Sequence, residues 1–315
     1  MAGHRRLRVA LLMGGSSSER EISLKSGRAV HKALNPAKYE VACYDPATDL
    51  NKLAKDAART DVAIVMLHGR GGEDGCIQGF LDCLGVPYQC AGVLGCAVAM
   101  NKTRSKALFR QAGLPVAEDV LILRGQPAPE KKALAALNLP VVVKPANEGS
   151  SVGVTIVHKP QDLTPALELA FSYDEEVVVE DFLKGIELTA SVLGNHTLTA
   201  LPLVEIIPTE KYAFFDYEAK YKPGATTEIC PARLEAGLTA RIQDLALRAH
   251  RCLGLKGYSR TDLILTDEGP VLLEVNTIPG MTETSLLPQA AAQAGMDFPA
   301  LMDRLIELAL EGRGQ

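Results

Sequence analysis

The chain has 315 residues, of which 47% are hydrophobic, and its formal net charge is −5. This length and composition allow a sizeable core and predict two or three domains. No Lys/Arg run indicates a nucleic-acid or membrane partner, and no stretch approaches the ~20 apolar residues that span a bilayer. The seven cysteines include no C-x-x-C pair, which argues against a disulfide framework and a zinc ribbon, so we expect a soluble cytoplasmic protein with reduced thiols.

Strands and helices alternate over the first part of the chain. Such alternation predicts an open parallel α/β sheet with helices on its faces, and ligands at the carboxyl ends of the strands. We expect strands at 8–13, 39–44 and 62–67 and helices at 19–34, 50–59 and 77–84.

Two glycine-rich loops, residues 14–20 and 68–75, follow the first and third of these strands. The first resembles a dinucleotide-binding fingerprint, but it lacks the G-x-G-x-x-G spacing, and Asp45 lies further along than the usual ribose-binding acid. A nicotinamide enzyme is therefore the weaker interpretation. Glu19, next to this loop, is a candidate to hold a substrate ammonium; the alternative is an acid that stabilises the first turn of a helix.

A second unit begins near Ala97 and contains a loop suited to a triphosphate. A β-branched strand ends at Lys144, and a Gly/Ser-rich loop, residues 146–153, leads into another strand. The lysine and the loop N–H groups would meet phosphate oxygens. This is not a Walker A loop, because G-x-x-x-x-G-K is absent and no helix follows; the alternative is an ordinary glycine-rich hairpin. Around it we expect helices at 101–113 and 129–137 and a strand at 120–123.

The next segments predict a base pocket and a lid. The strand at 176–183 ends in acidic residues followed by apolar ones. Its end would offer backbone polar groups and an apolar wall to a planar base. Residues 205–233 have little regular pattern but carry aromatic and charged side chains, so we expect a lid that reaches the site through Lys220 and Tyr221. Further expected elements are strands at 187–193 and 198–204 and helices at 235–253, 285–294 and 299–310.

Two strand-like segments, residues 260–265 and 271–276, flank the turn-forming sequence Asp-Glu-Gly-Pro. If they pair about this turn, Asp262 lies opposite Glu274, and Arg260 lies opposite Asn276. Side chains alternate along a strand, so these polar groups share one face. Their oxygens suit a hard cation such as Mg2+; the alternative is a solvated hairpin face. The other face would be buried and contains Leu263, Leu265, Val271, Leu273 and Val275.

The turn after this hairpin, residues 277–282, contains Gly280, which lets the backbone approach a ligand. A helix follows from Ser285, and backbone N–H groups at a helix start attract anions. A metal site beside an anion site is typical of a phosphoryl-transfer enzyme.

Several segments, in chain order, resemble those of the D-alanine–D-alanine ligases of the ATP-grasp superfamily. They are GGSSSER, HGRGGEDG, VVVKPANEGSSVGV, DYEAKY, the Arg260/Asp262 strand and EVNTIPGMTETSL. The resemblance covers essentially the whole chain. It implies an ATP-grasp fold with α/β and α+β parts: an N-terminal open parallel α/β substrate domain (1–97), a central ATP-clamping domain (98–185), and a C-terminal catalytic and metal domain (186–315) with the lid at 205–233.

The resemblance also implies a reaction. ATP would phosphorylate the carboxylate of one D-alanine, and the amine of a second would attack the acyl phosphate to give D-alanyl-D-alanine for peptidoglycan synthesis. A homodimer is implied as well. The metal ligands would be Asp262, Glu274 and Asn276, holding two Mg2+ ions or Mn2+ in their place. The ATP-binding residues would be Lys102, Lys144, Ser151, Glu180, Leu183, Glu187 and Lys220.

By the same resemblance, Glu19 would hold the ammonium of the first D-alanine, with His68 close by. Glu19 would also link through Ser150 to Tyr221 and keep the lid closed. A tyrosine at this position accompanies the use of an amine, which favours a dipeptide product.

The remaining implied roles concern the second D-alanine. Arg260 and the Gly280 N–H would stabilise the developing negative charge, and Ser285 and the Leu286 N–H would receive the second carboxylate. Two alternatives stay open: another ATP-grasp carboxylate–amine ligase, and a non-catalytic nucleotide-binding protein on this fold.

Overall fold

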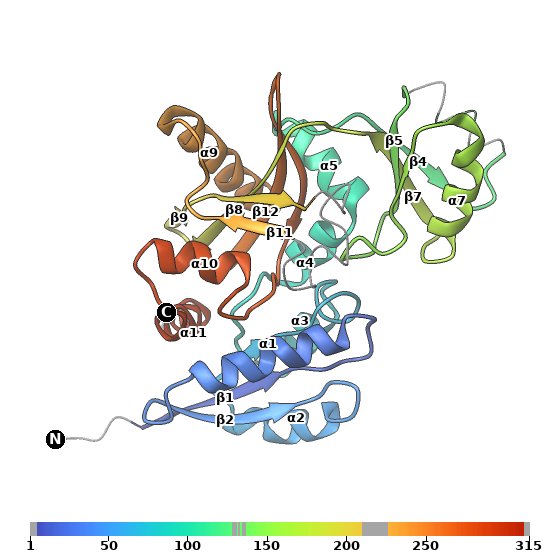
Figure 1. Cartoon of the computed structure of the whole chain (residues 1–315). Helices are drawn as coiled ribbons and strands as arrows, with labels where there is room; N and C mark the ends of the chain where they lie inside the picture. Colours follow the sequence, from blue (N-terminus) through green and yellow to red (C-terminus); the bar gives the residue numbers. More distant parts are fainter. Residues whose placement is uncertain (1–4, 128–130, 132, 134–136, 210–225, 312–315) are drawn as a thin grey trace.

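The computed structural model describes residues 5–127, 131, 133, 137–209 and 226–311. Within these residues the chain forms three sheets, which Figure 1 shows with their helices. Most of the helix expected at 129–137 lies outside the described residues, as do Lys220 and Tyr221.

The first sheet is parallel, with strand order β2-β1-β3, which confirms the α/β prediction. All four residues of β3 are buried, as expected where helices cover both faces of a parallel sheet. In Figure 1, α1 and α2 lie on either side of this sheet. Its elements are β1 (Leu7–Leu12), α1 (Arg20–Ala33), β2 (Tyr39–Tyr44), α2 (Leu50–Asp56) with a 3-10 turn at Ala57–Arg59, β3 (Val62–Val65) and α3 (Cys76–Cys83).

The second sheet is antiparallel, with strand order β4-β7-β5-β6. One helix, α7, packs against it and supplies much of a separate apolar core; our sequence analysis did not predict this helix. The elements are β4 (Asp119–Leu123), β5 (Val141–Pro145), β6 (Thr155–Val157), a 3-10 turn at Pro160–Asp162, α7 (Leu163–Phe171) and β7 (Glu176–Asp181).

The third sheet has strand order β11-β10-β8-β12-β13, and β9 pairs with β8. The single strand expected at 198–204 is wrong: it forms two strands separated at Pro202, which has no N–H for a ladder. Residues 205–233 are also more regular than expected, because they contain most of β10 and all of β11. The strands are β8 (Ile186–Gly194), β9 (Leu198–Ala200), β10 (Val204–Pro208), β11 (Thr226–Ile229), β12 (Tyr258–Thr266) and β13 (Gly269–Asn276).

Helices from two parts of the chain, residues 93–111 and 236–252, pack on this third sheet. Side chains of α4 (Val93–Met100) and α5 (Lys102–Gln111) share a core with α9 (Ala236–Cys252) and β13. α5 begins as expected, since the Asn101 side chain accepts a hydrogen bond from the Arg104 N–H. The predicted domain limit at residue 97 falls within α4, and the three predicted domain ranges stay a prediction.

The end of the chain returns to the first sheet. α10 (Leu286–Gln293) and α11 (Phe298–Leu310) belong to the same apolar core as β1 and β3, and Figure 1 places α11 beside α1. The turn between β13 and α10 is therefore held between the first and third sheets.

The β12–β13 hairpin contains a bulge that changes the expected pattern of burial. Arg260 pairs with Asn276 and Asp262 with Glu274, as predicted, but Leu263 then pairs with Leu272. The extra residue is Leu273. Because a bulge shifts the alternation by one, Leu272 is fully buried while Leu273 is not. The expectation that every odd-numbered residue of β13 is buried was therefore wrong.

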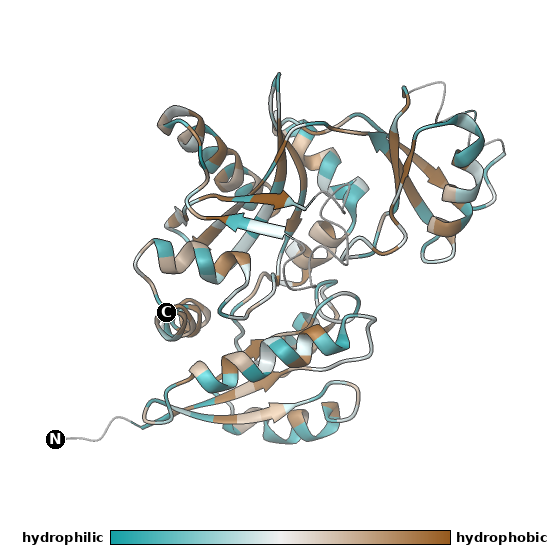
Figure 2. Cartoon of the chain, viewed as in Figure 1, coloured by the Kyte–Doolittle hydropathy of each residue, from teal (hydrophilic) through white to brown (hydrophobic). Residues whose placement is uncertain are grey.

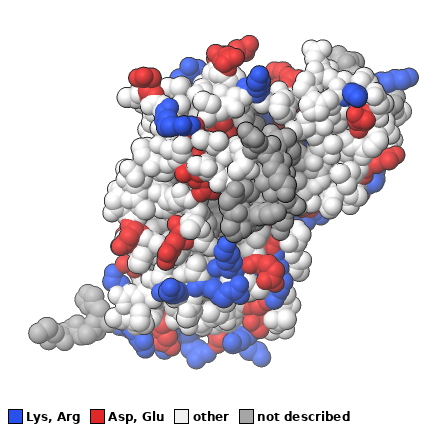
Figure 3. Space-filling model, in the orientation of Figure 1, with Lys and Arg blue, Asp and Glu red and all other residues white. Residues whose placement is uncertain are grey.

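In Figure 2 the strands contain many strongly hydrophobic residues, and hydrophobic and hydrophilic residues alternate along the helices. Acidic and basic side chains are interspersed over the face of the molecule seen in Figure 3. In the described part of the chain, no helix has the length and apolar character needed to cross a membrane.

The bulge predicts unequal effects of two neighbouring leucines on stability. Leu272→Ala should lower the free energy of unfolding by about 3 kcal/mol, since it leaves a cavity in a closed core. Leu273→Ala should cost about 1 kcal/mol, because its side chain is only half-buried. Denaturant unfolding of both variants measures this, and equal losses would contradict the register.

Candidate active site

The larger of two adjoining cavities lies where loops from all three sheets meet, and its volume is about 800 Å³. α1 and the loop after β3 line one side, β12, β13 and the following turn line another, and residues 148–150 approach from the second sheet. The predicted site residues in its wall are Glu19, His68, Lys102, Ser150, Arg260, Glu274, Asn276, Gly280, Ser285 and Leu286.

The smaller cavity has a volume of about 150 Å³ and lies between the second and third sheets. Lys102, Glu148 and Glu274 line both cavities, so the two adjoin. Apolar side chains form much of its wall, including Leu273, which the bulge turns towards it. The predicted site residues here are Lys102, Lys144, Ser151, Glu180, Leu183, Glu187, Asp262 and Glu274.

A buried ion cluster fixes the polar end of the smaller cavity. The Glu180 carboxylate contacts Lys144 Nζ at 2.5 Å and accepts a hydrogen bond of 2.7 Å from Lys106 Nζ. Lys106 also contacts Asp119 at 3.2 Å. Burial acts to raise the pKa of Glu180, but the two lysines outweigh it and hold the pKa below its usual value. Sequence reasoning missed Lys106 and Asp119, since nothing in their local pattern indicates this pairing.

The hairpin supplies oxygen ligands suited to a hard cation. Asp262 and Glu274 lie opposite each other on one face, and Arg260 makes two hydrogen bonds of 2.7 Å to the Asp262 carboxylate. Asn276 Oδ1 accepts a hydrogen bond from the Ile278 N–H. Among the described residues no three or more His, Cys, Asp or Glu side chains gather as a metal site. Two carboxylates and an amide oxygen nevertheless fit Mg2+, which retains water ligands and bridges to phosphate.

The loop after β5 contacts the start of α1. Ser150 Oγ donates a hydrogen bond to the buried Glu19 carboxylate. A Cβ on Gly149 would lie 3.1 Å from Glu19 Oε2, so a side chain there would crowd this carboxylate. Ser150 and Ser151 have φ values of 48° and 60°, a left-handed conformation that is uncommon for residues other than glycine and that concentrates at functional loops.

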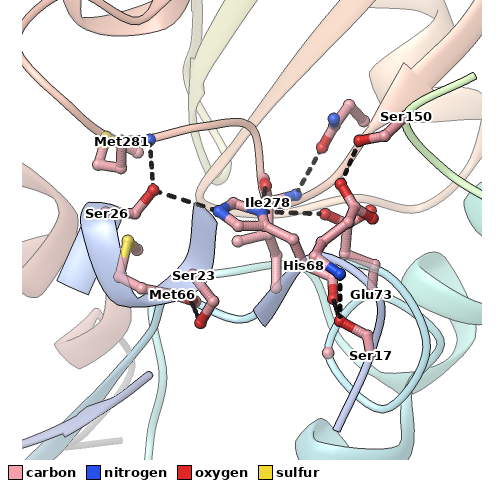
Figure 4. Close-up of polar contacts among 12 residues, drawn as sticks. Ser17, Ser23, Ser26, Met66, His68, Glu73, Ser150, Ile278 and Met281 are labelled. Carbon is pink, nitrogen blue, oxygen red and sulfur yellow. Dashed lines mark hydrogen bonds and ion pairs between the residues drawn. The ribbon is translucent and has the colours of Figure 1, made fainter. Parts of the chain in front are cut away.

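His68 connects the first sheet to the turn after β13 (Figure 4). Its Nδ1 lies 3.0 Å from the Ile278 carbonyl oxygen, which can only accept, so Nδ1 carries the proton. Nε2 then accepts from Ser26 Oγ at 3.2 Å, and this hydroxyl oxygen accepts from the Met281 N–H. Glu73 lies 3.4 Å from Nδ1, and burial raises the pKa of its carboxyl. Sequence reasoning missed Ser26 and Glu73.

The turn that holds Gly280 also packs against the start of α10. A Cβ on Gly280 would lie 3.3 Å from Ser285 Oγ, a tight contact that a larger residue would disturb. Ser285 Oγ accepts a hydrogen bond of 3.0 Å from the Thr282 N–H. The hydroxyl and the first N–H groups of α10 therefore meet at one side of the larger cavity.

The backbone amides of the first glycine loop already donate hydrogen bonds to neighbouring side chains. The Gly14 N–H donates to Ser23 Oγ, and the Gly15 N–H donates to Asp45 Oδ1. Asp45 also accepts a hydrogen bond of 2.6 Å from Arg20. Because Ser23 binds the Gly14 amide and Asp45 binds the Gly15 amide, these groups are already engaged within the protein, which weighs against their holding a dinucleotide.

Edge strand β11 and helix α10 complete the described wall of the larger cavity. Their contributions include Thr226, Glu228 and Gln289, which sequence reasoning also missed. For Thr226 and Glu228, the signal available in the sequence was their place near the end of the segment expected to form the lid.

Comparisons with known families and structures agree over nearly the full chain. A family profile described as "D-ala D-ala ligase C-terminus" matches residues 108–307, and "D-ala D-ala ligase N-terminus" matches residues 8–51 and 45–91. The D-alanine–D-alanine ligase of Syntrophobacter fumaroxidans is 57% identical over 306 residues, covering 97% of this chain and 98% of that protein. That of Desulfotalea psychrophila is 54% identical over 308 residues, covering 97% and 96%.

Two solved structures resemble the fold closely. The D-alanine–D-alanine ligase of Bacillus anthracis complexed with ATP has a TM-score of 0.86 at 33% identity, covering 98% of both chains. The VanG D-Ala:D-Ser ligase of Enterococcus faecalis has a TM-score of 0.84 at 32% identity, covering 97% of this chain and 100% of that one.

The buried ion cluster predicts a pH-dependent stability loss. Lys106→Met leaves two buried carboxylates with one cation fewer and should cost on the order of 3 kcal/mol at pH 7. Because the folded pKa of Glu180 is lowered, its ion pairs stabilise the fold above the carboxyl's unfolded pKa and lose this effect as pH falls through the folded pKa. In the variant, protonation relieves the uncompensated charge, so its deficit should shrink as pH falls.

Thermal unfolding of Lys106→Met and wild type between pH 7 and pH 4 measures this difference. Arg104→Met is the matched control, since Arg104 is exposed and lies 3.6 Å from Glu176; such surface pairs contribute under about 1 kcal/mol. A deficit that does not change with pH would contradict the assignment.

Proposed function

This chain belongs to the D-alanine–D-alanine ligase family and has the ATP-grasp fold, and we propose how its own residues perform the family reaction. It is an ATP-dependent ligase that joins two D-alanine molecules. A carboxylate is a poor electrophile towards an amine, so ATP activates it as an acyl phosphate, and positioning and charge stabilisation are the main tasks of the protein.

ATP occupies the smaller cavity in this proposal, with its phosphates towards the larger one. Lys144, at the end of β5, and Lys102, which lines both cavities, meet phosphate oxygens together with the N–H groups of the loop at Ser151. The apolar wall that includes Leu183 receives the adenine, and Glu187 lies beside the ribose. Glu180 keeps Lys144 in place through the buried ion pair.

Mg2+ would be held by Asp262, Glu274 and Asn276, which present oxygens from β12 and β13. When bound, it neutralises phosphate charge and orients the transferring group. Arg260 now binds Asp262 through both carboxylate oxygens, so this carboxylate is already fixed in orientation on the functional face of the sheet.

The first D-alanine lies in the larger cavity with its ammonium at Glu19 and its carboxylate towards the phosphates. Ser150 holds Glu19, and His68 holds the turn at Ile278, so the first sheet and the loop of the second enclose this substrate from opposite sides. The proposed contacts of Lys220 and Tyr221 fall outside the described residues.

The second D-alanine binds at the start of α10. Its carboxylate meets Ser285 Oγ and the Leu286 N–H, where helix N–H groups favour an anion. Its neutral amine attacks the acyl carbon, the carbonyl electrons move to oxygen, and Arg260 and the Gly280 N–H stabilise that charge. Collapse of the tetrahedral intermediate expels phosphate, and the amine proton leaves to solvent.

One observation supports the proposal most directly. Groups distant in sequence, from Glu19 to Leu286, line two adjoining cavities that share Lys102 and Glu274. We also propose that the enzyme works as a homodimer in the cytoplasm and supplies peptidoglycan precursors, which rests on the family resemblance.

Phosphate release from ATP tests the activity and the metal together. With D-alanine as sole amino acid, we expect Mg2+-dependent phosphate release and a D-alanyl-D-alanine product, and little release with a panel of other amino acids. Glu274→Gln should need at least tenfold more Mg2+ for half-maximal rate, because one carboxylate ligand is lost. Preference for another acid or amine would support a different ligase activity, and binding of ATP without turnover would support a non-catalytic protein.

The charge-stabilising role of Arg260 predicts a loss of turnover. Arg260→Ala should lower kcat about 100-fold, since losing one donor to a developing oxyanion costs about 3 kcal/mol, while the KM for ATP changes little. Steady-state phosphate release measures both constants. Arg248→Ala, on the outer side of α9, is the control, and an unchanged rate at saturating substrates would refute the role.

A further inference from the structure

Glu228 is a carboxylate in the wall of the substrate cavity, on edge strand β11. Side chains alternate along a strand, and here Thr226 and Glu228 line the cavity while Thr227 is exposed. β11 follows the segment expected to form the lid, so its cavity-facing residues stand at the border of the site.

The register of the sheet places Glu228 on the functional face. Glu228 pairs with Ile206, which pairs with Glu187, which pairs with Ile264. Residues directly opposite each other in antiparallel strands share a face. Ile264 is four residues after Arg260 on the same strand, so Glu228 and Arg260 point to the same side of the sheet.

Gln289 fixes the position of this carboxylate. Its Nε2 donates to Glu228 Oε2, and it also donates to the Thr284 carbonyl oxygen at 2.7 Å. Gln289 lies one turn beyond Ser285, whose carbonyl accepts its backbone N–H. Glu228 is therefore held beside the helix start that receives the second carboxylate.

The partner of Glu228 differs in kind from those of several other cavity acids. Burial raises the pKa of Glu228, and the hydrogen bond from Gln289 and the charge of Arg260 act against this shift. The hydrogen bond that Glu228 accepts comes from the neutral amide of Gln289, and a buried carboxylate held this way is complementary to a cation. In the described part of the chain, Glu274 has Lys102 and Glu148 has Arg70 as a basic partner, whereas Glu19, which holds an ammonium in the proposed function, accepts from the neutral hydroxyl of Ser150.

We propose that Glu228, oriented by Gln289, binds the ammonium group of the D-alanine that donates the amine. This rests on the proposed function, which puts that substrate's carboxylate at Ser285. In an α-amino acid the ammonium and the carboxylate are attached to the same carbon. A protein that binds the carboxylate at Ser285 must therefore contact the ammonium nearby. Glu228 then favours an α-amino acid over a 2-hydroxy acid as the second substrate, since a hydroxy acid has no ammonium to pair with the carboxylate.

Three variants of the full chain separate this role from a structural tie between β11 and α10. Glu228→Gln keeps the shape and a hydrogen-bond acceptor but removes the charge. Gln289→Lys keeps Glu228 and offers it an internal cation that competes with the substrate ammonium. Gln289→Met removes the hydrogen bond but leaves the charge. Thr227→Val, on the exposed face of β11, is the control for folding.

D-alanine is titrated calorimetrically into each protein holding a non-hydrolysable ATP analogue and Mg2+. We expect Glu228→Gln and Gln289→Lys to weaken the second of two D-alanine binding events at least tenfold, and Gln289→Met to weaken it less than threefold. The first event should stay within twofold of wild type. Because this readout measures binding, it is independent of whether the enzyme turns over.

Two results would overturn the proposal. If Glu228→Gln binds both D-alanine molecules like wild type while Gln289→Met does not, the pair is a structural tie. If the first event weakens instead, Glu228 serves the other substrate. A wild type that binds D-alanine but releases no phosphate would contradict the proposed function alone.

Discussion

The pairing of β12 with β13 is the constraint on which the rest of the site depends. It puts Asp262 opposite Glu274, where the two carboxylates can share a cation. The bulge that follows then turns Leu273 into the smaller cavity while Leu272 enters the core. One irregular hairpin thus borders both the charged and the apolar parts of a single substrate site. A slip of one residue would send every one of these side chains to the opposite face.

Loops of the three sheets meet at this site, where a few polar contacts link them. Ser150 reaches Glu19 from the second sheet, and His68 reaches the Ile278 carbonyl from the first. These links join loops; the apolar core of the second sheet is separate from the core that the first and third sheets share. Loops positioned by a rigid scaffold commonly carry binding residues, and both of these contacts lie on such loops.

The residues that sequence analysis missed share a physical reason. Lys106, Glu73 and Gln289 acquire their importance from partners on other elements, such as Glu180 for Lys106. Nothing in the local pattern of a helix or loop reveals such a partner. The bulge was missed for a related reason: two successive leucines allow either register, and only the packing of Leu272 into the core with α4, α5 and α9 selects one.

The sequence by itself determined the alternation of the first sheet, the hairpin with its polar face, the glycine-rich loop after Lys144, and the family resemblance. These follow from local periodicity and from motifs, which depend on neighbouring residues. Only the tertiary structure decided that Pro202 separates two strands, that Leu273 faces a cavity, and that Glu228 stands beside Gln289. Such outcomes depend on contacts between segments distant in the chain, and the free energy of those contacts is set by the packed fold as a whole.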